Sequence, residues 1–297
     1  MTILLTNAWL VTMDATMSEH ERGWVQIDGS AITALGAGTP PVIAGAEIID
    51  CNGDIVMPGM VNPHCHMGMS VFRGLGEDVD DRLYRYILPL ERQFVSPEMV
   101  RVGSALSAVE MIQGGVTSVA DMYYFETEVG RIADQAGLRA IVGQTLADFN
   151  APDHKDFDRG FALVEELVEQ FRDHPLVTPS IAPHAPYSTG LKVMERIADW
   201  SAAHPDVPVQ IHLAESDLEV KWALDNHSTS TVNVTHQSGL LKRGLICAHC
   251  LHLSDDDIAL MAEAEVRVVT NPRSNGKAGR GIAPVERLRT AGIPVGI

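Results

Sequence analysis

The sequence predicts an α/β protein that combines a (β/α)8 TIM barrel with a small N-terminal β-sandwich module. Residues 1–57 hold short segments rich in β-branched side chains and show no helical period. From Pro58 onward, apolar runs of strand length alternate with longer amphipathic segments, as repeated β/α units require. A chain of 297 residues also has room for a barrel of about 250 residues.

The N-terminal module, residues 1–57, is predicted to be a sheet because its apolar segments are short and are separated by turn residues. Gly, Asn and Asp interrupt the pattern every few residues, and these residues favour tight turns. The segments are ILLTNAWLVT, GWVQIDG, SAITALGAG and AEIIDCNGDIVMPG.

The barrel, residues 58–297, is predicted from eight runs of strand length. They are GMVNPHC, GVTSVADM, LRAIVGQT, LVTPSIAPHA, VPVQIHLAE, GLICAHC, VRVVTN and GIPVGI. Since the eighth run ends the chain, we expect the barrel to stop at its eighth strand, with the C-terminal part of the fold absent. A doubly wound open sheet is the alternative, but no glycine-rich dinucleotide-binding motif follows any of these runs.

Three of the segments between these runs carry clear helix signals. PEMVRVGSALSAVEMIQGG follows Ser96, a good N-cap, and ends at two glycines that favour termination. FDRGFALVEELVEQFRDH has an amphipathic pattern. SDDDIALMAEAE opens with a serine and three aspartates, which suit the positive end of a helix dipole.

The composition argues against several classes of protein. Acidic residues are spread along a chain of formal charge −17, and no basic stripe exists to meet phosphates, so we expect neither nucleic acid nor a membrane as a partner. No apolar run approaches the roughly 20 residues of a membrane span, and the N-terminus lacks signal-peptide features. Four cysteines are too few for a disulfide framework, and we interpret Cys247 and Cys250 as buried apolar residues rather than a zinc or redox motif. A cytoplasmic location is expected.

Histidines stand at the ends of four predicted strands. His64 and His66 end the first, His184 the fourth, His212 the fifth and His249 the sixth. Residues i and i+2 of a strand point to the same side, and barrel enzymes carry their chemistry at the carboxyl ends of the strands. Imidazole nitrogens suit Zn or Fe(II). The sequence therefore predicts a metal site at this end of the barrel.

Glu215 lies three residues after His212 and is a candidate general acid/base. A carboxylate beside an activated water can accept its proton and return it to a leaving nitrogen. The alternative is that Glu215 is an ordinary acid at the start of the following helix. The polar segment TNPRSNGKAGRG, after the seventh strand, is either a loop over the site or a generic turn.

These motifs, in this order, resemble the amidohydrolase superfamily, and in particular the branch that holds S-adenosylhomocysteine/methylthioadenosine deaminases, guanine deaminase and triazine hydrolases. The resemblance covers essentially the whole chain and rests on MPGMVNPHCH, FRGLGEDV, APHAPYS, HLAES, CAHCLHL, TNPRSN and GIPVGI. It implies a hydrolase acting on C–N bonds other than peptide bonds, namely an aminohydrolase (deaminase) of an amino-substituted heterocycle or nucleoside. Members of this family commonly form dimers or larger assemblies, so a homo-oligomer is expected.

The resemblance also implies roles for individual residues. One divalent metal ion, zinc or alternatively iron, would be bound by His64, His66 and His212. Glu215 matches the proton-shuttling glutamate, and His249 matches the histidine that orients the attacking water.

Two further residues match positions that contact substrate in the family. His184 matches a substrate-contacting histidine, and Glu91 matches an acid that holds ribose hydroxyls in the nucleoside deaminases. The alternative for Glu91 is a solvated helix residue.

Two departures from the family pattern leave alternatives open. The family's last metal ligand, an aspartate just after the eighth strand, is not reached before Ile297. The arginine that the homocysteine-type deaminases carry after the third strand is not evident, and Gln144 occupies the nearby position. The alternatives are a dechlorinating or ring C–N hydrolase of the same family, and a catalytically incomplete fragment or scaffold chain without the final aspartate.

Overall fold

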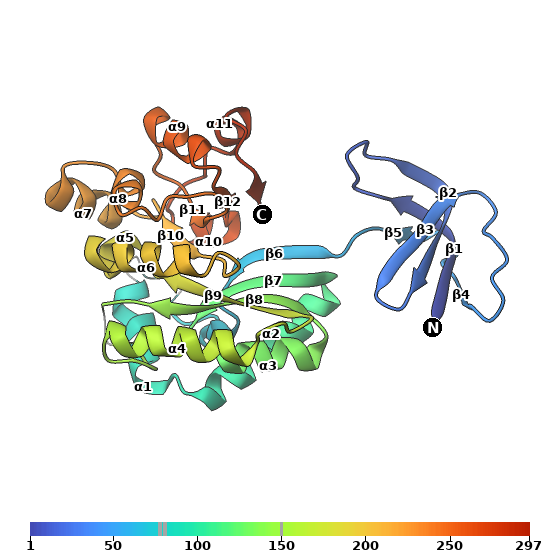
Figure 1. Cartoon of the computed structure of the whole chain (residues 1–297), viewed down its shortest axis with the longest axis horizontal. Coiled ribbons are helices and arrows are strands. Elements are labelled where there is room, and N and C mark those ends of the chain that lie inside the picture. Colours follow the sequence, from blue (N-terminus) through green and yellow to red (C-terminus); the bar gives the residue numbers. More distant parts are fainter. Residues whose placement is uncertain (77–78, 80–81, 149–150) are drawn as a thin grey trace. The chain divides into compact units, whose positions relative to one another are not determined.

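The structure, a computed structural model, describes residues 1–76, 79, 82–148 and 151–297. Its contacts divide the chain into two compact units, Met1–Met60 and Val61–Ile297 (Figure 1). Two sequence motifs extend past the described residues: FRGLGEDV includes residues 77 and 78, and the segment after the third predicted barrel strand includes residues 149 and 150.

The first unit is one five-stranded sheet. Its strands are β1 (Thr2–Val11), β2 (Glu19–Asp28), β3 (Ala31–Ala37), β4 (Glu47–Asp50) and β5 (Ile55–Val56). The order is β3-β2-β1-β4, and β5 also pairs with β1. Strand β2 is antiparallel to both β1 and β3, whereas β4 and β5 are parallel to β1. Ala8, Leu10 and Val25 form its small buried core. The expected N-terminal β module is therefore confirmed as a sheet.

The second unit contains the eight predicted strands in the predicted order. They are β6 (Met60–Cys65), β7 (Val116–Tyr123), β8 (Arg139–Leu146), β9 (Val177–Pro183), β10 (Gln210–Leu213), β11 (Ile246–His249), β12 (Arg267–Val269) and β13 (Val295–Gly296). They pair as β6-β7-β8-β9 and as β10-β11-β12-β13. A parallel bridge between Ile181 and Val209 joins the two sets.

The last strand approaches the first. A Cβ atom added at Gly296 would lie 3.1 Å from Pro63 Cγ, so β13 and β6 are in contact. A proline has no N–H to donate to a neighbouring strand. The strand order and this contact are those of a (β/α)8 barrel.

Helices alternate with these strands. They are a 3₁₀ helix (Met67–Phe72), a π-helix (Leu83–Ile87), α1 (Leu88–Phe94), α2 (Pro97–Gln113), α3 (Glu126–Ala136), α4 (Phe157–Gln170), α5 (Pro186–Thr189), α6 (Leu191–Ala203), α7 (Asp217–His227), α8 (Thr231–Gln237), α9 (Asp255–Glu263), α10 (Pro272–Lys277) and α11 (Val285–Thr290). In Figure 1, α3 and α4 lie along the sheet formed by β7, β8 and β9.

The three expected helices are confirmed as α2, α4 and α9, and their first residues explain why they begin there. The Ser96 side chain accepts a hydrogen bond from Met99 N at the start of α2. Asp156 caps α4 in the same way, and Ser254 forms a capping box with Asp257 at the start of α9. One difference from expectation is α10, because the segment predicted as a loop or turn contains a short helix that begins at Pro272.

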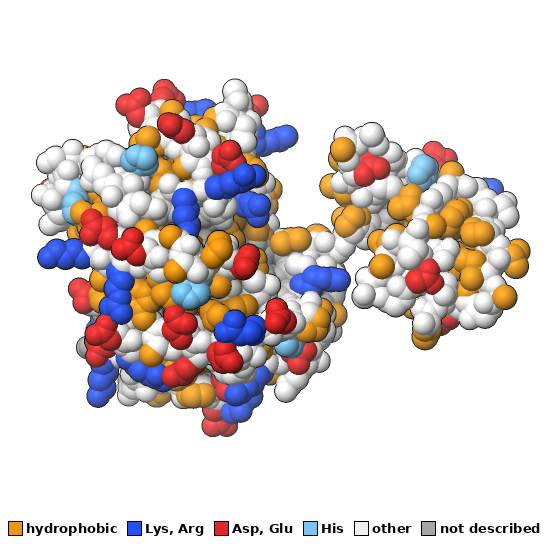
Figure 2. All heavy atoms as spheres, viewed as in Figure 1, with side chains coloured by type: hydrophobic (Ala, Val, Ile, Leu, Met, Phe, Trp, Pro, Cys, Tyr) orange, Lys and Arg blue, Asp and Glu red, His pale blue; other side chains and the backbone are white. Residues whose placement is uncertain are grey.

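The hydrophobic core of the second unit lies between these strands and helices. One cluster includes Ile181, Ile211 and Leu213, which are fully buried. Cys247 and Cys250 belong to it as free, buried cysteines, as expected. On the face shown in Figure 2, Lys and Arg side chains are scattered among Asp and Glu side chains. Within the described residues, no helix is long and apolar enough to cross a membrane.

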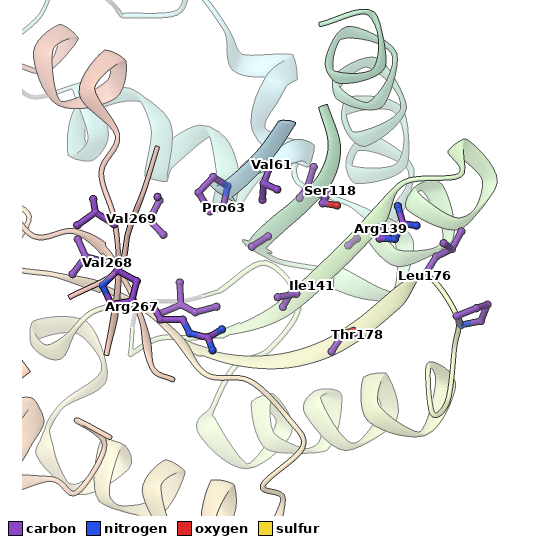
Figure 3. A pocket seen from close by; sticks show the side chains of 18 residues that line it. Val61, Pro63, Ser118, Arg139, Ile141, Leu176, Thr178, Arg267, Val268 and Val269 are labelled. Atoms are coloured by element: carbon purple, nitrogen blue, oxygen red, sulfur yellow. The ribbon is translucent and has the colours of Figure 1, made fainter. Parts of the chain in front are cut away.

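The amino ends of the barrel strands enclose a cavity of about 450 Å³. Figure 3 shows Val61, Ile141 and Val268 among the apolar side chains that line it, together with Arg139 and Arg267. None of the predicted site residues lies here. The chemistry-bearing side chains are at the opposite, carboxyl ends of the strands.

Candidate active site

A pocket of about 750 Å³ lies at the carboxyl ends of the barrel strands, and all seven predicted site residues line it. Because the strands are parallel, their carboxyl ends meet at one rim, and residues far apart in the sequence come together there. The seven residues are His64, His66, Glu91, His184, His212, Glu215 and His249.

His66 and His212 face each other through their Nε2 atoms. His66 Nδ1 is 2.5 Å from the carbonyl oxygen of Met122, and His212 Nδ1 is 2.7 Å from that of His184. A carbonyl oxygen can only accept, so each Nδ1 carries the hydrogen and each Nε2 presents a lone pair. These two Nε2 atoms are 3.3 Å apart. Two lone pairs at this distance repel each other unless a cation lies near both.

His64 completes the cluster from the same strand as His66. Its Nε2 atom is buried and has no hydrogen-bond partner among the described residues. One ligand atom from each of His64, His66 and His212 can be chosen so that all lie within 4.8 Å of one another. An unpaired buried nitrogen beside two facing lone pairs fits a divalent cation, since neutral imidazole is a common metal ligand.

Burial keeps His64 and His212 in the neutral form that binds a metal. Desolvation, followed by the neighbouring histidines, lowers the pKa of His64 and of His212 well below the ordinary value of 6.5. Burial also lowers the pKa of His184 to about 4, although the Glu215 carboxylate acts in the opposite direction. Imidazoles with lowered pKa values are neutral near pH 7 and can offer a lone pair.

Glu215 and His249 form the acid/base part of the site. Glu215 lies on the turn between β10 and α7, and its Oε1 is 3.5 Å from His249 Nε2. His249 Nδ1 is 2.8 Å from Asn275 Oδ1, so Nδ1 donates and Nε2 faces the carboxylate. Because neither a neutral Nε2 nor a carboxylate oxygen has a hydrogen to donate, the pair is arranged to receive a proton. The guanidinium group of Arg280 also contacts Glu215 Oε1.

On another side of the pocket, Glu91 on α1 accepts a hydrogen bond of 2.7 Å from the Tyr123 hydroxyl. Glu91 is 4% exposed, so it is a buried pocket residue and not a solvated helix residue. Burial raises its pKa to about 7, and the bond from Tyr123 partly offsets this effect. His184 is held by Ser188, whose Oγ lies 2.7 Å from His184 Nδ1.

Four residues at the site or directly behind it were not among the predicted site residues, namely Tyr123, Glu219, Asn275 and Arg280. Asn275 and Arg280 belong to the polar segment that was expected to be a loop or turn, and this polarity was the available signal. Glu219 bonds to the backbone of the Glu215 turn, and the Ser-x-x-Glu pattern of residues 216–219 was its signal. Tyr123 lay within an ordinary apolar strand and gave no signal.

A parallel (β/α)8 fold with a histidine-lined cation site at the carboxyl ends of its strands defines a class of metal-binding barrel proteins. The amidohydrolase family pattern matches residues 55–297, and this chain belongs to the amidohydrolase family.

Known proteins support this assignment at the levels of sequence and structure. A 5-methylthioadenosine/S-adenosylhomocysteine deaminase from Syntrophobacter fumaroxidans is 35% identical over 299 residues, which cover 99% of this chain and 68% of that protein. An adenosine deaminase from Xanthomonas campestris, whose crystal structure contains zinc, is 30% identical with a TM-score of 0.87 and covers 99% of this chain and 68% of that one. Guanine deaminase from C. acetobutylicum, with guanine in its active site, has the same fold, with a TM-score of 0.91 at 24% identity over 99% of this chain and 73% of that one. The TIM-barrel prediction and the predicted family are confirmed.

Proposed function

We propose that this protein is a zinc-dependent hydrolytic deaminase of an amino-substituted heterocycle or nucleoside. The observation that carries the proposal is that the Nε2 atoms of His66 and His212, each with a lone pair, lie 3.3 Å apart. Beside them, His64 Nε2 has no hydrogen-bond partner in the part of the chain that the structure describes. Glu215, which lines the same pocket and lies 3.5 Å from His249 Nε2, adds a proton carrier. The deaminase names of relatives at 30–35% identity support the reaction class.

The three histidines would hold the cation. A divalent cation at this position supplies the Lewis acidity that makes water a nucleophile at neutral pH. Glu215 accepts a proton from the attacking water and delivers it to the leaving amino nitrogen. His249, oriented by Asn275 through Nδ1, would accept a hydrogen bond from the attacking water at Nε2 and so orient that water.

The proposed substrate class follows from the polar groups around the cluster. Glu91, held by Tyr123, would accept hydrogen bonds from hydroxyl groups, as a ribose would provide, and His184 would contact the heterocycle. The amide of Gln144, near the position where the homocysteine-type deaminases carry arginine, donates to Asp153 instead. This arrangement favours a nucleoside or free heterocycle over a substrate that carries an amino acid.

The remaining sequence expectations are part of the same proposal. We propose that residues 1–57 form a separate domain from the barrel of residues 58–297. A homo-oligomeric state, a cytoplasmic location and the absence of a nucleic-acid partner are proposed from the family resemblance and the composition.

The test is an assay of zinc-loaded protein against a panel of adenine nucleosides, guanine, pterins and amino- or chloro-triazines. Ammonia and chloride release are measured separately. Glu215→Gln should lose at least about 100-fold in kcat, because general acid–base catalysis contributes about 10²–10⁴-fold, and it should bind zinc in the same stoichiometry as wild type. Full activity of this variant would contradict the mechanism, and release of chloride without ammonia would contradict the deaminase assignment.

A further inference from the structure

The turn that carries Glu215 is held by a second glutamate. Ala214 has φ 51°, a left-handed conformation that is unfavourable for a residue other than glycine. Glu219, in the first turn of α7, is 0% exposed. Its Oε1 is 2.8 Å from Ala214 N, and its Oε2 is 2.9 Å from Glu215 N. One carboxylate therefore fixes the two peptide units that set the direction of the Glu215 side chain.

These bonds differ from those of an ordinary helix cap. In a capping box, the acid three residues after the N-cap reaches back to the N-cap N–H. Asp257 at the start of α9 does this, with its Oδ2 2.9 Å from Ser254 N. Ser216 is the N-cap of α7, but the Glu219 carboxylate accepts from the two residues that precede this cap. These two hydrogen bonds therefore hold the turn and not the first residue of the helix.

The turn that carries Glu215 is also hydrogen-bonded to a second turn, which begins after His249, the last residue of β11. The carbonyl oxygen of Ala214 accepts hydrogen bonds from Leu251 N at 2.9 Å and from His252 N at 3.0 Å. His249 itself has φ 73°, so its backbone also needs support from its surroundings. With its N–H bonded to Glu219 and its carbonyl bonded to the neighbouring turn, Ala214 links the backbones that carry Glu215 and His249.

We propose that Glu219 is a positioning residue for the reaction, because its carboxylate holds the Glu215 carboxyl group against His249 and the histidine cluster. The inference rests on the proposed role of Glu215. Glu219 itself lies behind the turn, does not line the pocket and would not touch substrate. Its effect would appear in the rate of proton transfer and not in substrate affinity.

The test compares Glu219→Gln with Asp257→Asn. Gln has nearly the same size as Glu but has a single acceptor oxygen, so one of the two N–H groups faces an NH₂ group and loses its partner. We expect kcat to fall about 10- to 100-fold, because small displacements of a catalytic group are costly, while KM changes less than about 2-fold. The bound zinc stoichiometry should be unchanged.

Asp257→Asn is the matched control because it also removes a buried carboxylate from a first helical turn. It should lower the unfolding midpoint while leaving kcat within about 2-fold of wild type. Glu219→Asp, which keeps two carboxyl oxygens but has a shorter reach, should fall between Glu219→Gln and wild type. Since it keeps both acceptor oxygens, it also serves if Glu219→Gln does not fold.

Hydrogen exchange gives a readout that does not depend on turnover. The amides of Ala214 and Glu215 should exchange faster in Glu219→Gln than in wild type or in Asp257→Asn, and the same difference should appear in a Glu215→Gln background. Unchanged exchange at these amides, or a wild-type kcat in Glu219→Gln, would overturn the inference. An active Glu215→Gln would instead overturn the proposed function, so the two failures can be told apart.

Discussion

Replacing Glu91 by Gln should change how the stability of the protein depends on pH. Burial raises the pKa of this carboxyl group from 4.5 to about 7. A raised pKa means that the folded state favours the protonated form. The contribution of Glu91 to stability is therefore fully present below pH 4.5 and is lost as the pH rises through about 7.

The size of this effect follows from the shift. Raising the pKa from 4.5 to about 7 is a change of about 2.5 units, and each unit corresponds to about 1.36 kcal/mol, which gives about 3 kcal/mol in total. Gln is close in size and neutral at every pH. Relative to wild type, the free energy of unfolding of Glu91→Gln should therefore rise by about 2–3 kcal/mol between about pH 5 and pH 8.5.

The assay is urea unfolding followed by circular dichroism at steps of pH, with a chelator present so that metal binding does not contribute. Tyr123→Phe is the companion variant: it removes the hydroxyl that lowers the pKa of Glu91, so the loss of stability should move to higher pH. Parallel stability curves for wild type and Glu91→Gln over this pH range would refute the reasoning.

Three further changes have defined outcomes. His64→Asn should reduce bound zinc from one per chain to near zero by elemental analysis while the circular dichroism spectrum is retained, because one of three ligands is lost; full zinc content would contradict the site. Asn275→Ala should lower kcat about 10-fold or more with little change in KM, because His249 loses the acceptor that fixes its Nδ1–H. Steady-state kinetics at saturating zinc measure both constants, and an unchanged kcat would contradict the role of Asn275. Ile211→Ala, at a fully buried core position, should destabilise the protein by about 2–5 kcal/mol in urea unfolding, and a loss below about 1 kcal/mol would show that the site is not packed as described.

Most of the histidine cluster could be predicted from the sequence because strand periodicity is local information. His64 and His66 are two residues apart, so a strand turns them to one side, and β6 confirms the strand. His212 and His249 lie near the ends of predicted strands and within the last two residues of β10 and β11, and parallel pairing of β10 with β11 brings those ends to the same rim. Alternation of strands and helices predicted that pairing.

The surroundings of these residues could not be predicted in the same way. The positions of Asn275 and Arg280 depend on the path of the segment after β12, whose polarity was compatible with a loop, a turn or the short α10 helix. The sequence pattern around Glu91 is compatible with either a solvated or a buried side chain. The structure shows that Glu91 is buried and bonded to the Tyr123 hydroxyl. Glu219 carries a helix-cap pattern, yet it bonds to residues before the cap.

The sequence by itself determined which chemical groups stand at the ends of which strands, because apolar periodicity and turn residues act over a few neighbouring positions. Only the tertiary structure decided which atoms of those groups face one another. The tautomers of His66 and His212 are set by carbonyl oxygens of Met122 and His184, each many residues away along the chain. Hydrogen bonds of this kind depend on the packing of separate strands. This packing orients the histidine rings so that their Nε2 atoms face one another and fit a cation.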